Sequence, residues 1–419
     1  MSKILVEGGK NLFGTIPISG AKNSCLTLMP LSILSGETLT LENTPFLSDV
    51  DTMKDLLESL GCGVLYSKQE KKIKLKMNVE DKYTAEYKIV KKMRASILVL
   101  GPLLAKYGRA VVALPGGCAI GTRPVNLHLF GLEALGAKFS IDNGYIKGSV
   151  DGKLKGALIN FPTKSVGATA NIIMASVLAK GITEIKNAAQ EPEIIDLCNC
   201  LKKMGCKIEG IGEQKITIEG IDQLGKAKHH VIMDRIELGT YILAGAISDG
   251  EINLTGGDLK PLKSFVNKLS SIGIDVTQDK STICVKRIDE NIKPVDIVTE
   301  PFPGFPTDLQ AQIMALLSIA DGVSSIEENI FENRFMHVPE LIRMGANIEI
   351  RGRKALIKGV TGLKGVPVIA TDLRASVSLV LAGLVAKGET VIDEIHHLDR
   401  GYEHLVSKLT ACGAKIRRV

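Results

Sequence analysis

The chain of 419 residues contains no tryptophan, and aromatic residues make up only 4% of it. It has no long basic run with interleaved aromatic residues, which argues against a nucleic-acid-binding protein. The first residues, MSKILVEGGKNLFG, lack an apolar core long enough for a signal peptide. The longest apolar runs, 96–105 and 377–386, are shorter than the roughly 20 residues of a membrane span. We therefore expect a cytoplasmic protein that binds neither nucleic acid nor membrane.

The sequence also lacks a recognisable metal site. Cys198 and Cys200 are too closely spaced for a zinc knuckle and lie in a helical pattern, so we interpret them as packing residues. The side chains of His396 and His397 diverge because the two residues are adjacent, and no third ligand is evident near them in the sequence. We predict no metal, and we expect the eight cysteines to be reduced in the cytoplasm.

Composition is typical of a globular protein, with 45% hydrophobic and 23% charged residues. The length favours two domains over one. A formal net charge of +6, with acidic and basic residues interspersed, fits a small anionic substrate.

One pattern recurs six times along the chain. An alanine-rich apolar helix ends at a glycine, a β-rich run follows, and a shorter amphipathic helix ends at a second glycine. Two strand runs follow each second helix except the last, and residues 3–9 and 15–19 resemble the missing strands. We predict six α/β repeats, three per domain, with a boundary near 220–234 and the N-terminus closing the C-terminal domain. The first helices end at Gly36, Gly108, Gly181, Gly250, Gly322 and Gly388, and the second at Gly61, Gly136, Gly205, Gly273, Gly345 and Gly413.

Charged and polar residues gather at the starts of the first helices, as Lys22 does in SGAKN and Asp308 in FPTD. If these helices run side by side, their starts lie at one end of each domain, where free backbone N–H groups and helix dipoles attract anions. This clustering argues against a plain solenoid and predicts a cleft between the domains. For single residues the alternatives are ordinary: a solvated lysine or arginine, or an aspartate that caps its helix.

The segment PGGCAIGTRP places Cys118 on a glycine-rich loop after an apolar strand run at 110–114. Glycines allow close approach of the backbone to a ligand. Arg123, five residues later, would lower the pKa of the thiol. A thiol that titrates near neutrality can transfer a proton or attack a carbon electrophile. We predict that Cys118 is functional and that the other cysteines are small apolar packing residues.

Several motifs together resemble one enzyme family, the UDP-N-acetylglucosamine enolpyruvyl transferases. The related EPSP synthases share the six repeats and the phosphoenolpyruvate chemistry but lack the cysteine loop, so PGGCAIG favours the first family. The similarity extends over essentially the whole chain, in the right order. Its motifs are SGAKN at 19–23, PGGCAIGTRP at 115–124, SVGAT at 165–169, EPEI at 191–194, DRIE at 234–237, FPTDLQAQ at 305–312, ENRFMHVPEL at 332–341, TDLRAS at 371–376 and LDRGYE at 398–403.

The resemblance implies a two-domain inside-out α/β barrel of six βαβαββ repeats. One domain would hold residues 22–232 and the other 1–21 plus 233–419, with the active site in the cleft between them. It implies transfer of the enolpyruvyl group of phosphoenolpyruvate to the 3′-hydroxyl of UDP-N-acetylglucosamine, with release of phosphate, through a tetrahedral intermediate. This is the first committed step of peptidoglycan synthesis, and the family is the target of the epoxide fosfomycin. No metal, cofactor or macromolecular partner is implied, and we expect a monomer.

The resemblance also assigns roles to individual residues. Cys118 would be the acid that protonates C3 of phosphoenolpyruvate and Asp308 the base for the sugar hydroxyl, with Lys22 and Arg400 as further catalytic residues. Phosphoenolpyruvate would contact Lys22, Asn23, Arg94, Arg123, Asp372, Arg374 and Arg400. UDP-N-acetylglucosamine would contact Arg94, Arg123, Leu127, Lys164, Ser165, Val166, Gly167, Asp308 and Ile330.

Two other functions stay open at this point. One is enolpyruvyl transfer to a different acceptor, shikimate 3-phosphate. The other is a non-catalytic repeat protein that binds nucleotide sugars and carries Cys118 as a redox-sensing thiol.

Overall fold

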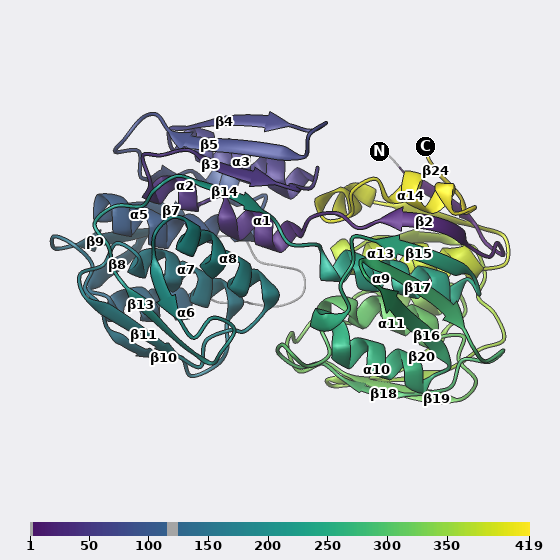
Figure 1. Cartoon of the computed structure of the whole chain (residues 1–419). Helices are drawn as coiled ribbons and strands as arrows, with labels where there is room; N and C mark the ends of the chain where they lie inside the picture. The colour runs from purple at the N-terminus through teal and green to yellow at the C-terminus, as the bar shows by residue number, and fades with distance from the viewer. Residues whose placement is uncertain (1–2, 115–124) are drawn as a thin grey trace. The chain divides into compact units, whose positions relative to one another are not determined.

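The computed structural model describes residues 3–114 and 125–419. It divides into two compact units, each with its own hydrophobic core (Figure 1). We call residues 20–114 with 125–232 the N-terminal unit, and residues 3–19 with 233–419 the C-terminal unit. No helix in these described ranges is both long enough and apolar enough to cross a membrane.

Among the described residues, each unit contains three four-stranded sheets of one design. An edge strand runs parallel to its neighbour, and the other two pairs are antiparallel. In the N-terminal unit the sheets are β14 (Ala227–His230), β3 (Leu39–Glu42), β5 (Lys72–Met77) and β4 (Cys62–Ser67); β6 (Thr84–Ala85), β7 (Arg109–Ala113), β9 (Tyr145–Val150) and β8 (Ala137–Asp142); and β10 (Leu158–Asn160), β11 (Ile182–Lys186), β13 (Lys215–Glu219) and β12 (Lys207–Glu209). In the C-terminal unit they are β16 (Ile274–Asp279), β17 (Thr282–Arg287), β15 (Glu251–Thr255) and β2 (Phe13–Pro17); β18 (Asp296–Val298), β19 (Val323–Glu327), β21 (Lys354–Lys358) and β20 (Asn347–Arg351); and β22 (Pro367–Ile369), β23 (Glu389–Asp393), β1 (Ile4–Glu7) and β24 (Lys415–Arg418).

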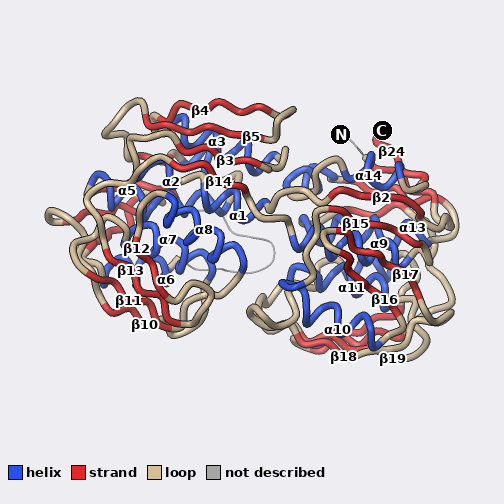
Figure 2. Tube along the Cα trace, in the orientation of Figure 1, coloured by secondary structure: helices blue, strands red, loops and turns tan. Residues whose placement is uncertain are grey.

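The apolar first helices lie inside each unit, and the strands lie toward its outside (Figure 2). Helix α9, for example, buries every residue except its first, Arg235. A helix that is apolar all round has to be covered on all sides, and the surrounding sheets cover these. The expected inside-out α/β fold of six repeats is thereby confirmed. The first helices are α1 (Lys22–Leu28), α5 (Leu100–Tyr107), α7 (Val166–Ser176), α9 (Arg235–Ile247), α11 (Gln310–Leu317) and α13 (Leu373–Val385); the second are α3 (Ser48–Ser59), α6 (Asn126–Ala134), α8 (Pro192–Lys203), α10 (Lys263–Ser271), α12 (Val338–Arg343) and α14 (Leu405–Ala411).

The glycine predicted to follow each second helix has the backbone conformation that this position requires. All six have φ between 88° and 103°. Most side chains are strained there, so glycine at these positions ends the helix and turns the chain into the next strand.

The opening strands join two different sheets. Strand β1 lies between β23 and β24 and is antiparallel to both, so it supplies the strand that the sixth repeat lacks. We expected the second opening run to complete that repeat as well, and this is wrong: β2 pairs in parallel with β15 of the fourth repeat. The reason is an exchange of strands. Strand β14, which precedes α9, pairs with β3 in the N-terminal unit, so β2, which precedes α1, takes the corresponding place beside β15.

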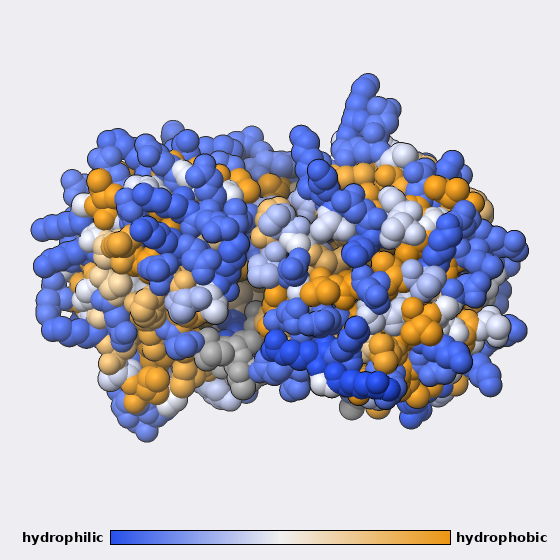
Figure 3. Space-filling view, turned by 90° about the horizontal axis from the view of Figure 1, so that it is seen from below, coloured by the Kyte–Doolittle hydropathy of each residue, from blue (hydrophilic) through white to orange (hydrophobic). Residues whose placement is uncertain are grey.

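The surface is predominantly polar on the face shown in Figure 3, with apolar residues scattered among charged ones. Large apolar side chains that are exposed, such as Leu65 and Phe13, lie on strands of different sheets. Single apolar residues of this kind are normal on a globular protein and mark no interface by themselves.

Candidate functional site

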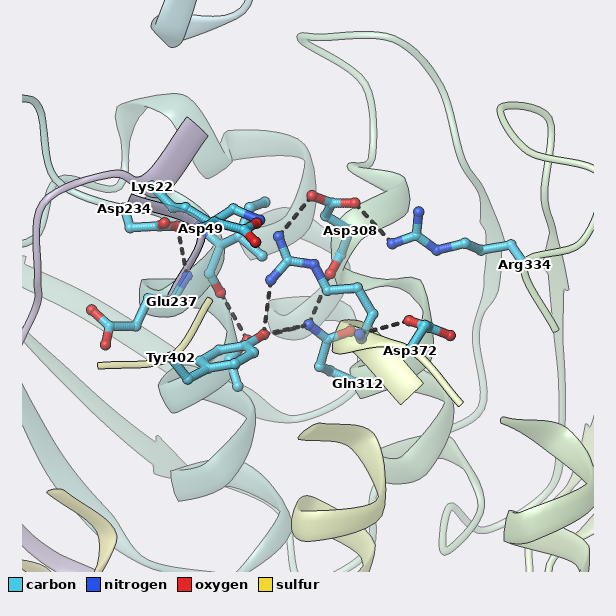
Figure 4. Close-up of polar contacts among 12 residues, drawn as sticks. Lys22, Asp49, Asp234, Glu237, Asp308, Gln312, Arg334, Asp372 and Tyr402 are labelled. Atoms are coloured by element: carbon cyan, nitrogen blue, oxygen red, sulfur yellow. Dashed lines mark hydrogen bonds and ion pairs between the residues drawn. The ribbon is translucent and has the colours of Figure 1, made fainter. Parts of the chain in front are cut away.

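In the C-terminal unit, Asp308 lies between two arginines. It belongs to the short 3₁₀ helix η3 (Thr307–Leu309), directly before α11. One carboxylate oxygen accepts a hydrogen bond from Nη2 of Arg334 at 2.8 Å, and the other accepts one from Nη2 of Arg374 at 2.8 Å (Figure 4). The side chain of Asp308 is 27% exposed, whereas those of the arginines are 4% and 8% exposed. Charge-assisted bonds of this kind stabilise the ionised carboxylate while one side of it stays accessible.

Arg374 is the second residue of α13, and its guanidinium also donates to the hydroxyl of Tyr402 at 3.0 Å. Burial by itself would lower the pKa of Arg374, but the negative charge of Asp308 outweighs this, and the pKa is raised above its usual range. Arg374 is therefore a permanent cation inside the unit.

The hydroxyl of Tyr402 connects side chains from three buried helices. Nε2 of Gln312 on α11 lies 3.2 Å from it, and Oγ1 of Thr240 on α9 lies 3.0 Å from it. Burial raises the pKa of Tyr402 in spite of the opposing charge of Arg374, so the phenol keeps its proton. It can therefore accept from Arg374 and donate to Thr240, whose own hydroxyl donates to the carbonyl of Ile236 at 2.8 Å.

Asp372 and Arg400 lie near this network along the chain. Asp372 caps α13, because its side chain accepts from the backbone N–H groups of Arg374 and Ala375 at 2.7 and 3.1 Å. Asp372 therefore has the ordinary role of an aspartate that caps its helix, as the sequence also allowed. Arg400 ends the 3₁₀ helix η4 (Ile395–Arg400) and is half-buried.

In the N-terminal unit, Lys22 is the first residue of α1 and is 9% exposed. Its Nζ lies 3.3 Å from Oδ2 of Asp49 on α3. Figure 4 draws the two side chains next to each other. A lysine at a helix start is disfavoured by the dipole, and a buried ammonium is costly, so Asp49 compensates for both. Asn23, the next residue, is exposed.

A second group of predicted residues gathers at the starts of α6 and α7. Leu127 lies in the first turn of α6, and Ser165 caps α7 by accepting from the N–H of Ala168 at 3.3 Å. Nζ of Lys164 donates to Gln190 at 3.0 Å. A Cβ on Gly167 would lie 3.2 Å from the ring of His128 in α6, so glycine lets the two helix starts approach closely. Val166, the first residue of α7, is exposed.

Two further predicted residues lie elsewhere in the described part of the chain. Arg94 begins the 3₁₀ helix η1 (Arg94–Val99) and is half-buried. Ile330 lies in the C-terminal unit, where its backbone N–H donates to Glu328 at 2.9 Å. Cys118 and Arg123 lie outside the described residues.

The cysteines that the structure describes are buried or half-buried, and burial raises the pKa of each. The pKa rises to about 12 for Cys25, Cys198, Cys200 and Cys206. The interpretation of Cys198 and Cys200 as packing residues is confirmed. Among the described residues, no three His, Cys, Asp or Glu side chains come together as a metal site would require.

Sequence reasoning missed several residues of these networks, among them Asp49, Gln312, Arg334 and Tyr402. Gln312, Arg334 and Tyr402 lie inside motifs that carried the resemblance, FPTDLQAQ, ENRFMHVPEL and LDRGYE, and that was the available signal. Asp49 lies in no such motif. Two guanidinium groups, those of Arg334 and Arg374, face Asp308.

Comparison with known proteins places this arrangement in a family. Residues 6–409 match the family model described as EPSP synthase (3-phosphoshikimate 1-carboxyvinyltransferase). The chain belongs to the EPSP synthase family. Among curated members, the UDP-N-acetylglucosamine 1-carboxyvinyltransferase of Dinoroseobacter shibae is 59% identical over 419 residues, which cover 100% of this chain and 99% of that protein. The protein of the same name from Ruegeria pomeroyi is 57% identical over 419 residues and 100% of both chains.

Solved structures of other family members share the fold. The enolpyruvyl transferase NikO from Streptomyces tendae superposes with a TM-score of 0.90 at 23% identity, over 100% of this chain and 99% of that one. An EPSP synthase from Acinetobacter baumannii gives a TM-score of 0.76 at 16% identity, over 100% of both chains.

Proposed function

We propose that this family member catalyses the reaction for which its curated relatives are named. It transfers the enolpyruvyl group of phosphoenolpyruvate to UDP-N-acetylglucosamine and releases phosphate, a step of peptidoglycan synthesis. The observation that carries this is identity of 52–59% along the whole chain to proteins of that name. The solved EPSP synthases, by contrast, are 16% identical to it.

The chemistry requires fixed positive charge. Phosphoenolpyruvate carries a phosphate and a carboxylate, and the acceptor carries a diphosphate, so the two reactants repel each other. Lys22, Arg94 and Arg400, together with Arg123, bind these anions in our proposal, and the planar guanidinium groups suit both phosphate and carboxylate. Residues of both units then act on the same pair of substrates.

The proton transfers follow from the order of bond changes. Cys118 gives a proton to C3 of phosphoenolpyruvate, which makes C2 electrophilic. Asp308 takes the proton of the sugar hydroxyl as that oxygen attacks C2. The tetrahedral intermediate loses a proton from C3 and expels phosphate, with Asn23 and Asp372 orienting it. The arginines beside Asp308 support this role, because each holds one carboxylate oxygen in a fixed position.

The acceptor binds in our proposal along the starts of α6 and α7 and at Ile330. Leu127 and Val166 offer apolar contact, and Lys164 offers a cation for the diphosphate. Ser165 and Gly167 add backbone N–H groups at the start of α7, where a helix dipole favours an anion.

Phosphate release from phosphoenolpyruvate tests this function. The purified protein should release phosphate with UDP-N-acetylglucosamine, and mass spectrometry should find the acceptor enlarged by one enolpyruvyl group. Release with shikimate 3-phosphate alone would instead identify the EPSP synthase reaction. Binding of the nucleotide sugar without release from either acceptor would favour a non-catalytic binding protein.

A further inference from the structure

A buried carboxylate, that of Glu328, connects two segments of the C-terminal unit. Glu328 follows β19 and is 1% exposed. Its Oε2 accepts from the hydroxyl of Thr307 at 2.9 Å. Its Oε1 accepts from the backbone N–H groups of Ile330 and Phe331, at 2.9 and 3.1 Å, and from the hydroxyl of Thr299 at 2.9 Å. All four of these donors are neutral.

The two oxygens therefore hold different segments. Thr307 is the first residue of η3 and directly precedes Asp308, so Oε2 fixes the backbone that carries the proposed base. Oε1 fixes the turn at Ile330, where the nucleotide sugar is proposed to bind. The turn is further tied to the sheet, because Thr299 accepts from the N–H of Asn329 at 2.9 Å.

The free-energy cost of burying the carboxylate of Glu328 indicates that the side chain has a specific role. A buried carboxylate without a cation is costly to form, and only a full set of hydrogen bonds offsets its desolvation. A neutral side chain such as Asn or Ser could close a surface turn at lower cost. A charged acceptor with two oxygens instead allows one side chain to set the position of two segments at once.

We propose that Glu328 is a positioning residue for the proposed reaction. Through Oε2 and Thr307 it places the carboxylate of Asp308 against the sugar hydroxyl. Through Oε1 it places the backbone at Ile330 against the nucleotide sugar. The proposal rests on the proposed function. It adds that the effect on the Asp308 carboxylate and the effect on nucleotide-sugar binding can be separated by substitution.

Thr307→Val cuts only the link to the Asp308 segment, with Thr307→Ser as its matched control. In Thr307→Val, kcat should fall about tenfold, as expected for one lost hydrogen bond to a charged group, while KM for UDP-N-acetylglucosamine stays within about twofold. Thr307→Ser restores the hydroxyl and should restore kcat. A merely structural role would lower the melting temperature of Thr307→Val without this split between kcat and KM.

Glu328→Ala removes both links. It should lower kcat and raise KM for the nucleotide sugar, each about tenfold, with KM for phosphoenolpyruvate within about twofold. Glu328→Gln keeps an oxygen for the backbone N–H groups and should recover KM. If Glu328→Ala does not fold, the Thr307 pair still decides the matter, since Thr307 is only half-buried.

Two results would overturn the proposal. One is equal kcat for Thr307→Val and Thr307→Ser. The other is a rise in KM for the nucleotide sugar in Thr307→Val as large as in Glu328→Ala. Failure of the proposed function would look different, because the unmodified enzyme would then release no phosphate with UDP-N-acetylglucosamine.

Discussion

At the scale of single residues, the pairing of Asp308 with two arginines allows its chemical and structural roles to be separated. Asp308→Asn keeps a hydrogen-bond acceptor between Arg334 and Arg374 but cannot accept a proton. Turnover should fall by about a hundredfold or more, the usual size of a lost general base, while nucleotide-sugar binding persists. Phosphate release and calorimetric titration measure the two quantities.

Asp308→Ala serves as the comparison. It leaves two buried guanidinium groups without any acceptor at this position, so it should lower the melting temperature more than Asp308→Asn, which keeps one accepting oxygen. Loss of binding in Asp308→Asn as great as its loss of turnover would argue that the carboxylate is structural.

The cysteines make a second prediction at this scale. Fosfomycin should alkylate Cys118 and stop turnover, because alkylation needs a thiolate and burial raises the pKa of every cysteine that the structure describes. Peptide mass spectrometry should locate one adduct, on Cys118. Cys118→Asp keeps a proton donor without the sulfur nucleophile, so it should retain residual activity and resist the inhibitor, whereas Cys118→Ala should be far less active. An adduct on a different cysteine, with activity lost, would refute the assignment.

How much of the site the sequence could predict differs from residue to residue. The motif around Asp308 marks that residue, but its partners Arg334 and Arg374 follow 26 and 66 residues later, on other elements. The packing of α11 against α13 brings Asp308 and Arg374 together, whereas Arg334 comes from the turn before α12. The inert nature of Cys198 and Cys200, by contrast, was predictable, since their spacing does not suit a zinc site and they lie in a helical pattern.

At the scale of elements, Tyr402 ties α9, α11 and α13 together, and a neighbouring tyrosine provides a control. Tyr402→Phe would leave N–H groups of Arg374 and Gln312 buried without this acceptor. It should cost about 1–3 kcal/mol of the free energy of unfolding and lower kcat about tenfold, because Arg374 would no longer be held against Asp308. Urea denaturation and steady-state kinetics test this.

Tyr241 on α9 is the matched control. Its hydroxyl is buried and has no hydrogen-bond partner among the described residues. Tyr241→Phe should therefore leave the free energy of unfolding and kcat nearly unchanged. If Tyr402→Phe and Tyr241→Phe change the free energy of unfolding and kcat equally, the hydrogen bonds of Tyr402 do not contribute to stability or turnover.

The repeats were predictable at this scale, because helix periodicity and the glycines after the second helices recur along the chain. The partner of β2 was not. Its alternating pattern fits any sheet edge in the C-terminal unit, and only the exchange of β2 with β14 decides which edge it joins.

At the scale of the whole molecule, His337 makes stability depend on pH. It is 1% exposed, with Nε2 3.2 Å from the sulfur of Met314. Burial lowers the pKa of His337 from 6.5 to about 4. Between pH 6.5 and pH 4, His337 binds a proton in the unfolded chain but stays neutral in the folded chain. The free energy of unfolding should therefore fall as pH drops from 6.5 toward 4, by roughly 3 kcal/mol in total.

His337→Gln removes this group and should flatten the dependence in that pH range. Urea denaturation between pH 7 and pH 4.5 measures it, with His396→Gln, an exposed histidine in the same unit, as the control. An identical pH dependence in His337→Gln and in the unmodified protein would contradict the prediction.

The position of β1 between β23 and β24 has a consequence for biosynthesis. Residues 20–232 form a contiguous stretch, so the N-terminal unit can fold on the ribosome while the rest is still being translated. Strand β1 is translated before the N-terminal unit, whereas both of its neighbours are translated after it. The nascent chain must therefore carry an unpaired apolar strand while the whole N-terminal unit is being made.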